Sequence, residues 1–457
     1  MIELSNAILQ QKDNLVKTVQ ECIRIPSVQQ QDRSGAPYSA EIRRCLQFVL
    51  NTAKNMGFTT INMDDQMGWC ELGEGKEMVL VLGHLDVVPA GDGWNGDPFS
   101  GDIRDGKIFG RGAIDDKGPA IAALFALKAM KDSGLVLQRR IRLLFGCNEE
   151  TGSADIKYYL THGGEVPTCG FTPDGEYPVI NGEKGIINVK VRHDWKTSET
   201  IQMSRLMGGK APNVVPSSAL AEIACPKKMQ ETFMKNLPPK VSATAIKNGI
   251  RFEAKGISAH GSTPEQGENA IGRLLIALAD RLPTGEQKET IAFLADKIGM
   301  DTTGEKLGIA LHDEISGSLT FNLGTIRSDE KGIELFINYR YPVTLSYEDC
   351  APKLMQCFTD QGFYQVEELH KKKLYIPEDN ELVQKLLHVY AKQTGLPAKA
   401  KCIGGGTYAK SLPNTVAFGP IFPGDEIREH KANEYIEIDK LVQNAAIFAA
   451  AMYELAR

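Results

Sequence analysis

Residues 79–86 of the chain read VLVLGHLD, an apolar run that ends directly in a histidine and an aspartate. Two further short runs are also mainly apolar, IRLLFGC at 141–147 and GFT at 170–172. Each is followed within two residues by a carboxylate. None of the three alternates regularly between apolar and polar side chains, which is typical of strands buried on both faces. An apolar helical segment at 119–130 separates the first two runs. The order strand, helix, strand predicts a parallel sheet covered by helices.

The remaining chain contains two kinds of segment. Apolar residues follow helical spacing in the first 30 residues, at 39–56, at 382–391 and at 440–455. From about Gly185 to Pro377, alternating runs predict half-buried strands instead. We therefore predict the α/β class: a discontinuous domain at 1–185 and 378–457 holds a mixed, largely parallel sheet flanked by helices and carries the catalytic site. An α+β domain at 186–377 is inserted into it as a lid.

Composition and charge narrow the class of protein. The chain has 457 residues, 42% hydrophobic and 24% charged, as in an ordinary globular protein. A net charge of −6 gives no electrostatic footprint for nucleic acid, and the longest apolar runs are far shorter than a membrane span. The first residues lack the apolar stretch of a signal peptide, and nine scattered cysteines form no C-x-x-C pair. We expect a cytoplasmic protein without a nucleic-acid or membrane partner.

Acidic side chains gather where the predicted strands end. One histidine and six carboxylates lie there or in the turn GRGAIDDKG at 110–118: His84, Asp86, Asp115, Asp116, Glu149, Glu150 and Asp174. Parallel sheets place their sites at the carboxyl ends of the strands, so we expect these side chains to share one edge. Like charges at close range raise one another's pKa, and divalent metals supply the cations that such a cluster requires. A lone histidine is more often structural and a Glu-Glu pair more often faces water, but neither explanation suits the whole arrangement.

The same motifs resemble the successive signatures of the co-catalytic zinc metallopeptidases, the group of aminoacylase, carboxypeptidase G, succinyl-diaminopimelate desuccinylase and carnosinase. They are GHLDVVP at 83–89, GRGAIDDKGP at 110–119 and NEETGS at 148–153. Within that group, FTPDGEYP at 171–178 and INGEKG at 180–185 look most like the PepV-type bacterial dipeptidases. The match runs in order along essentially the whole chain. It implies a two-metal hydrolase that cleaves the peptide bond of dipeptides.

The resemblance also implies a set of metal ligands. It assigns His84 and Asp174 to one divalent ion, Glu150 and His430 to the other, and Asp115 as a bridge between them. The peptide bond between Asp115 and Asp116 would be cis. His430, in EHKANE at 429–434, is singled out mainly by the resemblance. Zinc is the expected metal, and manganese or cobalt also suits carboxylate and imidazole ligands.

Two residues beside these ligands have expected roles in the reaction. Two metals that share a water lower the pKa of that water and polarise the scissile carbonyl. Glu149 is next to a ligand but points elsewhere, which makes it the candidate general base that moves the water's proton to the leaving amine. Asp86 lies on the same side of an extended strand as His84, so its carboxylate could hold the imidazole from behind.

The lid domain contains further residues that the resemblance places at the substrate. His260, in KGISAHGS at 255–262, would stabilise the oxyanion across the cleft, although the residues alone leave a structural role equally open. Asn213 and Arg340 would contact the substrate, and arginine can hold a carboxylate through two hydrogen bonds. A surface arginine at a strand end is the alternative. After the lid domain, a glycine-rich loop comprises Gly404, Gly405, Gly406 and Thr407. The resemblance implies that this loop receives the substrate's C-terminal carboxylate. The alternative is a merely flexible turn.

Other functions fit parts of the sequence. An N-acyl-amino-acid deacylase or desuccinylase would share the metals but act on another substrate, and dimeric relatives of that kind have a smaller insertion. The long insertion favours a monomeric dipeptidase, with Xaa-His and β-alanyl-histidine among its candidate substrates. A non-catalytic, metal-dependent peptide-binding protein would require a degraded site, whereas every expected ligand and the base are present. GDGWNG at 91–96 formally matches a dinucleotide fingerprint, but no apolar helix follows it.

Overall fold

The structure is a computed structural model that describes residues 2–30, 35–196 and 202–457. The chain divides into two units. The first unit comprises 1–182, 376–401 and 406–457, and the second comprises 183–375 and 402–405. The sequence predicts 186 and 377 as the ends of the insertion. A short piece of the glycine-rich loop also belongs to the second unit.

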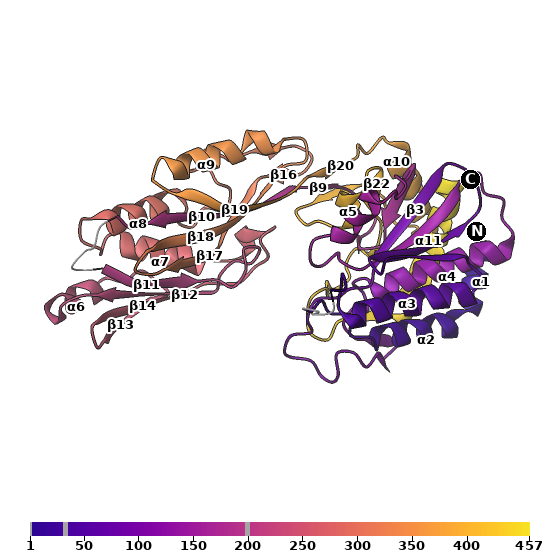
Figure 1. Ribbon diagram of the computed structural model, residues 1–457, viewed down its shortest axis with the longest axis horizontal. Coiled ribbons are helices and arrows are strands. Elements are labelled where there is room, and N and C mark those ends of the chain that lie inside the picture. Colours follow the sequence, from indigo (N-terminus) through magenta and orange to yellow (C-terminus); the bar gives the residue numbers. More distant parts are fainter. Residues whose placement is uncertain (1, 31–34, 197–201) are drawn as a thin grey trace. The chain divides into compact units, whose positions relative to one another are not determined.

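A mixed sheet forms the centre of the first unit (Figure 1). Its main strands follow the order β1 (Thr60–Met63), β2 (Met67–Leu72), β6 (Arg140–Gly146), β3 (Met78–His84), β7 (Cys169–Thr172), β22 (Thr415–Ala417) and β9 (Ile180–Glu183). The neighbours β6, β3, β7 and β22 run parallel to one another. The flanking pairs β1–β2, β2–β6 and β22–β9 are antiparallel. The predicted fold class, with a mixed and largely parallel sheet, is confirmed.

The strand β3 shows why its sequence does not alternate. Every residue from Met78 to His84 is buried. Successive side chains of a strand point to opposite faces, and here Val79 and Val81 pack into the core under the larger helices. Leu80 and Leu82 pack on the other face with Tyr159. Because both faces are covered, both sets of positions must be apolar.

Helices cover both faces of this sheet. They are α1 (Ile2–Gln10), α2 (Lys12–Ile23), α3 (Ala40–Asn55), α4 (Lys117–Ser133), α5 (Ala154–Thr161), α10 (Glu381–Thr394) and α11 (Ile438–Ala456). The helices α4 and α11 lie side by side against β3, and α4 is buried around most of its circumference, which explains its uninterrupted apolar run. The helical pattern of the first 30 residues forms two helices separated at Gln11.

Short elements shape the loops near the strand ends of the first unit. They are β4 (Asp102–Arg104), β5 (Lys107–Phe109), β8 (Gly175–Glu176), the 3-10 helix η3 (Tyr408–Ser411), β23 (Pro420–Ile421) and β24 (Tyr435–Glu437). The strand β21 (Lys401–Ile403) begins at the last residue of a first-unit segment and continues into the second unit. The pairing of β24 with β5 joins the end of the EHKANE segment to the turn that begins at Gly110. The pairing of β23 with β8 fixes the chain just after Asp174.

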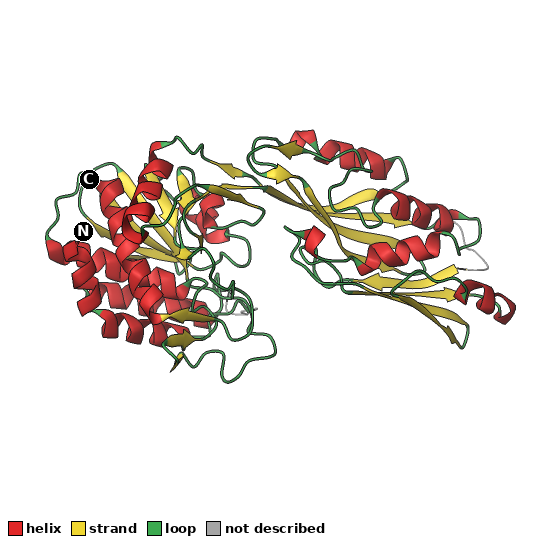
Figure 2. Ribbon diagram, turned by 180° about the vertical axis from the view of Figure 1, so that it is seen from behind, coloured by secondary structure: helices red, strands yellow, loops and turns green. Residues whose placement is uncertain are grey.

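The second unit is an antiparallel sheet with helices packed on it (Figure 2). The order is β13 (Val241–Ile246), β14 (Gly249–Lys255), β12 (Ser218–Ala224), β11 (Gln202–Gly208), β17 (Thr320–Ser328), β18 (Gly332–Tyr341), β10 (Gly185–Asp194) and β19 (Tyr364–Lys371). The helices are α6 (Lys227–Met234), α7 (Ala270–Ala279), α8 (Glu286–Lys297) and α9 (Ala351–Thr359). The remaining short elements are η1 (Pro264–Gln266), β15 (His312–Asp313), β16 (Gly317–Ser318), η2 (Tyr347–Asp349) and β20 (Leu374–Tyr375). Burial alternates along most of β10, as expected for strands with one face toward a core.

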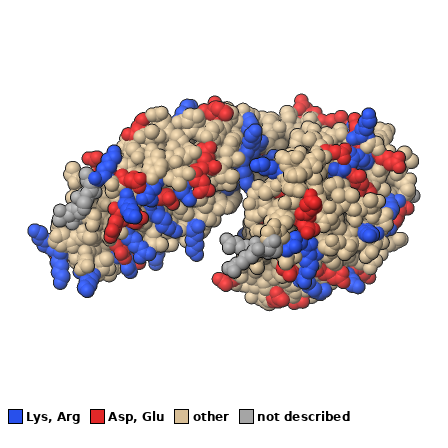
Figure 3. Space-filling model, in the orientation of Figure 1, with Lys and Arg blue, Asp and Glu red and all other residues tan. Residues whose placement is uncertain are grey.

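The surface carries charges of both signs. Lysine and arginine side chains are interspersed with aspartate and glutamate over the face drawn in Figure 3. Within the described ranges of the chain, no helix is both long and apolar enough to cross a membrane. All nine cysteines are free thiols.

We expect the packing on both faces of the central sheet to dominate the stability of the first unit. Leu144 in β6 is fully buried in the cluster around Tyr159. Leu144→Ala should lower the free energy of unfolding by about 2–5 kcal/mol, because the truncation leaves a cavity. Urea unfolding followed by circular dichroism measures this loss.

A matched substitution on the surface provides the control. Leu9 in α1 is 58% exposed, so Leu9→Ala should change the free energy of unfolding by no more than about 0.5 kcal/mol. Equal losses from the two substitutions would contradict the proposed role of the buried layer.

Candidate metal centre

The parallel strands deliver ligating side chains to one edge of the sheet. His84 is the last residue of β3, and the neighbouring strands β6 and β7 end at Gly146 and Thr172. Glu150 follows the first of these strands within a turn, and Asp174 follows the second. Because the three strands are parallel neighbours, their carboxyl ends meet, as open α/β sheets require for a site.

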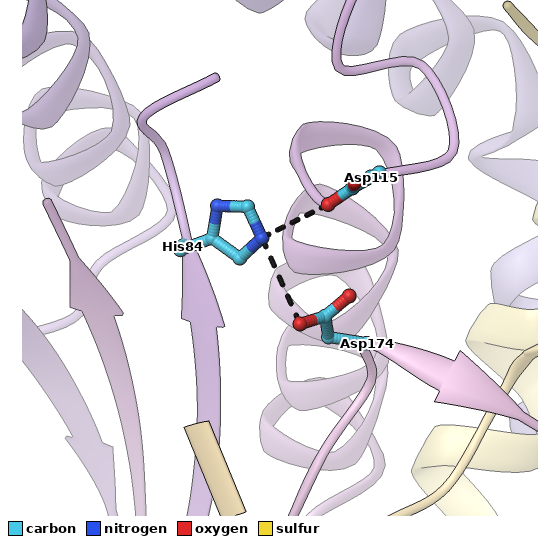
Figure 4. A group of neighbouring side chains, drawn as sticks. All are labelled: His84, Asp115 and Asp174. Atoms are coloured by element: carbon cyan, nitrogen blue, oxygen red, sulfur yellow. Dashed lines mark hydrogen bonds and ion pairs between the residues drawn. The ribbon is translucent and has the colours of Figure 1, made fainter. Parts of the chain in front are cut away.

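One group of ligands surrounds the imidazole of His84. Its Nε2 lies 3.0 Å from Oδ1 of Asp115 and 3.8 Å from Oδ2 of Asp174. Figure 4 shows this ring nitrogen directed at both carboxylates, which come from different segments. The His84 side chain is fully buried and Asp174 is 15% exposed. The three donor atoms converge on one point and could hold a metal ion.

A second group surrounds the imidazole of His430. Its Nε2 lies 3.0 Å from Oδ2 of Asp115 and 3.1 Å from Oε2 of Glu150. His430 has a φ of 59° and its side chain is 55% exposed, whereas the two carboxylates are almost completely buried. The loop thus brings an exposed histidine to buried acids, and these three residues could hold a second ion.

The carboxylate of Asp115 belongs to both groups. Its Oδ1 faces His84 and its Oδ2 faces His430. The peptide bond from Asp115 to Asp116 is cis. The Asp116 carboxylate is fully buried and accepts a hydrogen bond from the backbone N–H of His84 at 3.0 Å. Two adjacent aspartates therefore have different tasks: one faces both histidines and the other fixes the end of β3.

The donor atoms fit divalent cations. Bonds from zinc to nitrogen or oxygen are about 2.0–2.2 Å long, so the ligand atoms of a tetrahedral zinc lie roughly 3.3 Å apart. The observed separations of 3.0, 3.1 and 3.8 Å between histidine nitrogens and carboxylate oxygens bracket this value. The donor set contains imidazole and carboxylate but no thiolate, which suits zinc, manganese and cobalt alike.

The pKa values of the cluster show that its buried carboxylates and its histidines interact strongly. Burial and the neighbouring Asp115 raise the pKa of Asp174 to about 7. Hydrogen bonding to Asp115 and to a neighbouring glutamate raises the pKa of His430 to about 11. Burial would raise the pKa of Asp115, but hydrogen bonds with the two histidines bring it below its usual range. A metal ion that binds these histidines must displace the protons they share with Asp115.

Asp86 holds more than the imidazole of His84. The nearer acceptor for His84 Nδ1 is the main-chain oxygen of Asp86 at 2.9 Å, while the carboxylate lies at 3.5 Å. The two carboxylate oxygens accept hydrogen bonds from the backbone N–H groups of Glu149 and Glu150, each at 3.1 Å. Asp86 therefore fixes both the histidine of one ligand group and the turn that carries Glu149. The side chain of Glu149 is half-buried at this turn.

Sequence reasoning missed a second support beneath this turn. Asp155, fully buried at the start of α5, accepts hydrogen bonds from the backbone N–H groups of Cys147 and Asn148 at 2.7 and 3.0 Å. The hydroxyl of Tyr408 donates to the same Asp155 oxygen at 2.5 Å. Nothing in the sequence distinguishes this aspartate from a solvated one. Tyr408 directly follows the glycine-rich loop in the sequence, and that position is the only feature that could have pointed to it.

The second unit brings several predicted substrate residues together. The backbone of Asn213 lies beside His260, because the N–H of Gly261 donates to the Asn213 carbonyl at 2.8 Å. His260 is exposed, and its Nδ1 lies 2.6 Å from the hydroxyl of Ser262. A Cβ on Gly404 would lie only 2.8 Å from the Cβ of Ser262, so a residue with a side chain does not fit at this position.

Arg340 joins this group from β18. It is 3% exposed and donates hydrogen bonds to Asn338 Oδ1 at 3.2 Å and to the Gly404 carbonyl at 2.6 Å. Among the residues that the structure describes, no carboxylate pairs with it, and burial lowers its pKa to about 10. It is therefore a buried arginine rather than a surface one.

The glycine-rich loop makes contacts within the protein at Gly404 and Thr407. None of the residues from Gly404 to Gly406 has a positive φ, so the loop lacks the left-handed turn of an anion nest. Gly404 contributes its carbonyl to Arg340. Thr407 caps η3 by accepting a hydrogen bond from the backbone of Ala409. The role of Gly404, Gly405, Gly406 and Thr407 at the substrate stays a prediction.

Comparison with known proteins assigns the chain to a family. A family model described as "Peptidase family M20/M25/M40" matches residues 80–454. The chain belongs to this family. It is 39% identical to the Bacillus subtilis (strain 168) protein named "Putative dipeptidase YtjP", with 98% of this chain and 99% of that protein covered. It is 34% identical to the "Beta-Ala-Xaa dipeptidase" of Lactobacillus delbrueckii subsp. lactis, with 98% and 97% covered.

Solved structures show the same fold at lower identity. Human carnosine dipeptidase 1 superposes with a TM-score of 0.58 at 18% identity, covering 99% of each chain. The dipeptidase Dug1p from Saccharomyces cerevisiae gives a TM-score of 0.61 at 14% identity, covering 99% of this chain and 98% of that one. The resemblance seen in the motifs is confirmed. The protein is a metal-dependent hydrolase of this family.

The shared carboxylate predicts how two ions should respond to substitution. Asp115→Asn should weaken the binding of both ions, because each group loses a charged oxygen. His430→Ala should weaken only one of them and leave the group around His84 intact. Elemental analysis after dialysis against buffered Zn²⁺ gives the number of ions per chain.

The control for this prediction is an aspartate remote from the cluster. Asp439 in α11 has a side chain that is 91% exposed and pairs with Lys12, so Asp439→Asn should leave the metal content of the wild type unchanged. If Asp115→Asn and His430→Ala each lost one ion, Asp115 would not be shared.

Proposed function

We propose that this protein is a two-metal dipeptidase. The observation that carries the proposal is the carboxylate of Asp115, whose two oxygens face two different histidines. Asp115 belongs to both groups of donor atoms that could hold an ion, so two ions could share it as a bridge. The names of relatives that match nearly the whole chain support a dipeptide as the substrate.

The residues for two ions are those of the two groups. We propose His84 and Asp174 for one ion, Glu150 and His430 for the other, and Asp115 for both. When bound, two such ions supply positive charge that polarises the scissile carbonyl and lowers the pKa of a shared water. Zinc is the metal we propose first, and manganese or cobalt would suit the same donors.

Glu149 is the proposed general base. It adjoins the ligand Glu150, and the backbone N–H groups of both residues are held by Asp86. This anchorage fixes the turn, so the Glu149 carboxylate starts from a defined backbone position. It would accept the proton of the attacking water and deliver it to the departing amine. Asp86 acts through the turn and through His84 rather than on the substrate.

The second unit supplies the proposed substrate contacts. His260 would stabilise the oxyanion, and Asn213 beside it would orient the substrate. Arg340 is buried, positively charged and without a carboxylate partner among the described residues, so a substrate carboxylate is the group that would complete it. A dipeptide has such a carboxylate at its C-terminus. We further propose that the enzyme works as a monomer in the cytoplasm.

The assignment of Glu149 leads to a direct test. Glu149→Gln keeps the size of the side chain and removes its basicity. We expect both metal ions to remain bound while kcat falls by about 10²–10⁴-fold, the usual contribution of a general base. Steady-state kinetics on a dipeptide, with metal content measured on the same sample, checks this. A metal-replete variant with near-wild-type kcat would rule out the assignment.

The substrate class needs its own test, because a deacylase of the same family would share the metals. We expect kcat/KM to be higher for dipeptides than for N-acetyl and N-succinyl amino acids. The dipeptide panel should include β-alanyl and histidine-containing members, since one relative is named for β-alanyl substrates. Chelation of the metal should abolish the activity and Zn²⁺, Mn²⁺ or Co²⁺ should restore it.

Three outcomes of that panel separate the candidate functions. Faster hydrolysis of the acylated amino acids would replace the dipeptidase proposal with the deacylase. Binding of dipeptides without turnover in the presence of each metal would favour a peptide-binding protein. Hydrolysis restricted to dipeptides supports the proposal.

A further inference from the structure

A buried ion pair lies beside the candidate metal centre. Arg111, in the turn before α4, is 1% exposed, and Glu434, just before β24, is fully buried. Their Nη1 and Oε2 atoms are 2.6 Å apart. Neither residue belongs to the two groups that could hold metal ions. Burying two charges is costly unless further hydrogen bonds satisfy the remaining donors and acceptors, and here those further bonds go to the backbone around the ligands.

Glu434 holds the backbone of the shared ligand. Its second oxygen, Oε1, accepts hydrogen bonds from the N–H groups of Ile114 at 3.0 Å and Asp115 at 3.3 Å. Its main-chain oxygen accepts a hydrogen bond from Gly110 at 3.0 Å. The carboxylate therefore fixes the peptide units that lead directly to the Asp115 side chain.

Arg111 ties two other segments to the same point. Its Nη1 also contacts the carbonyl of Lys431 at 3.4 Å, and its Nη2 donates to the carbonyl of Ala90 at 3.2 Å. Lys431 directly follows His430. Ala90 lies a few residues after His84 and Asp86. The planar guanidinium reaches these acceptors together, which a lysine ammonium does not reproduce.

The exposure of His430 makes such an anchor necessary. Its side chain is 55% exposed, so packing against neighbours does little to fix it. Glu434 lies four residues later in the same loop and is fully buried. The loop is thus held at its buried end, and the exposed histidine is directed back toward Asp115.

We propose that Arg111 and Glu434 are a positioning pair that sets the separation of Asp115 and His430 before any metal binds. The inference rests on the proposed metal centre. A site whose ligands are already in place has less ordering to undergo on binding, so the pair raises the affinity for the ions. Neither residue touches the substrate or the reacting atoms.

Two conservative variants of the full-length protein test the pair. Glu434→Gln keeps an oxygen for the backbone N–H groups but removes the charge opposite Arg111. Arg111→Lys keeps the charge but loses the planar fork. We expect either variant to weaken Zn²⁺ binding by about 10–100-fold, the range found when groups that orient metal ligands are changed. Competition between the metal-free protein and a chromophoric chelator measures the affinity.

The double variant adds a second readout. If the two residues act as one unit, combining the substitutions should weaken Zn²⁺ binding by less than the product of the two single effects. Excess Zn²⁺ should restore much of the activity toward a dipeptide, because the ligands themselves are unchanged. Independent effects that multiply would overturn the claim that the two residues act as a pair.

Arg142 provides the matched control. It is also a buried arginine of the first unit, and its carboxylate partners, Glu71 and Glu165, are not among the metal-group residues. Arg142→Lys should lower the unfolding temperature without changing Zn²⁺ affinity. If Arg111→Lys and Glu434→Gln behaved in this way too, the pair would be merely structural and the inference wrong. If one of these two variants does not fold, the Zn²⁺ affinity of the other variant decides whether the inference holds.

The experiment also separates this inference from the proposed function. Wild-type protein that binds two ions but does not hydrolyse dipeptides would refute the proposed substrate and leave the positioning pair standing. Normal dipeptidase activity together with unchanged Zn²⁺ affinity in both variants would refute only the pair. Wild-type protein that binds no Zn²⁺ would overturn both.

Discussion

The carboxylate of Asp115 lies between two histidines, and much of the surrounding structure serves to hold it there. His84 is fixed by the end of β3, by the Asp116 carboxylate on its backbone N–H, and by Asp86 on its Nδ1. His430 approaches from the other side on an exposed loop. Acidic groups this close together repel one another and raise each other's pKa. The arrangement therefore persists only while positive charge, from protons or from metal ions, lies between them.

The residues at the strand ends are the ones that the sequence predicts best. His84, Glu150 and Asp174 follow buried apolar runs, and the rule that parallel sheets gather their sites at the carboxyl ends of the strands places them together. The same apolar runs also predict the sheet itself, and in the structure β6, β3 and β7 are parallel neighbours. Hydrophobic patterning thus carries information about the site because the site is built on the core.

Loop residues escape this kind of reasoning. His430 has a positive φ and lies far along the chain, so only its resemblance to a family motif points to it. The hydrogen bonds that join Asp155 to Tyr408 and Arg111 to Glu434 connect residues distant in sequence, and no periodicity encodes those contacts. The break between α1 and α2 at Gln11 is missed for a simpler reason: both helices keep the same apolar spacing. In the second unit, Arg340 is buried, whereas a surface arginine at a strand end is the alternative that the sequence alone leaves open.

The order of strands in the first sheet has a consequence for synthesis of the chain on the ribosome. The strand β22, at Thr415–Ala417, pairs with β7, at Cys169–Thr172, although the whole second unit is translated between them. Until the last part of the chain emerges, β7 has an open edge on that side, and open edges can pair with other chains. His430 emerges later still. Four of the five proposed ligands are therefore synthesised well before the fifth. A nascent or truncated chain that stops before β22 has neither a closed sheet nor a complete metal centre.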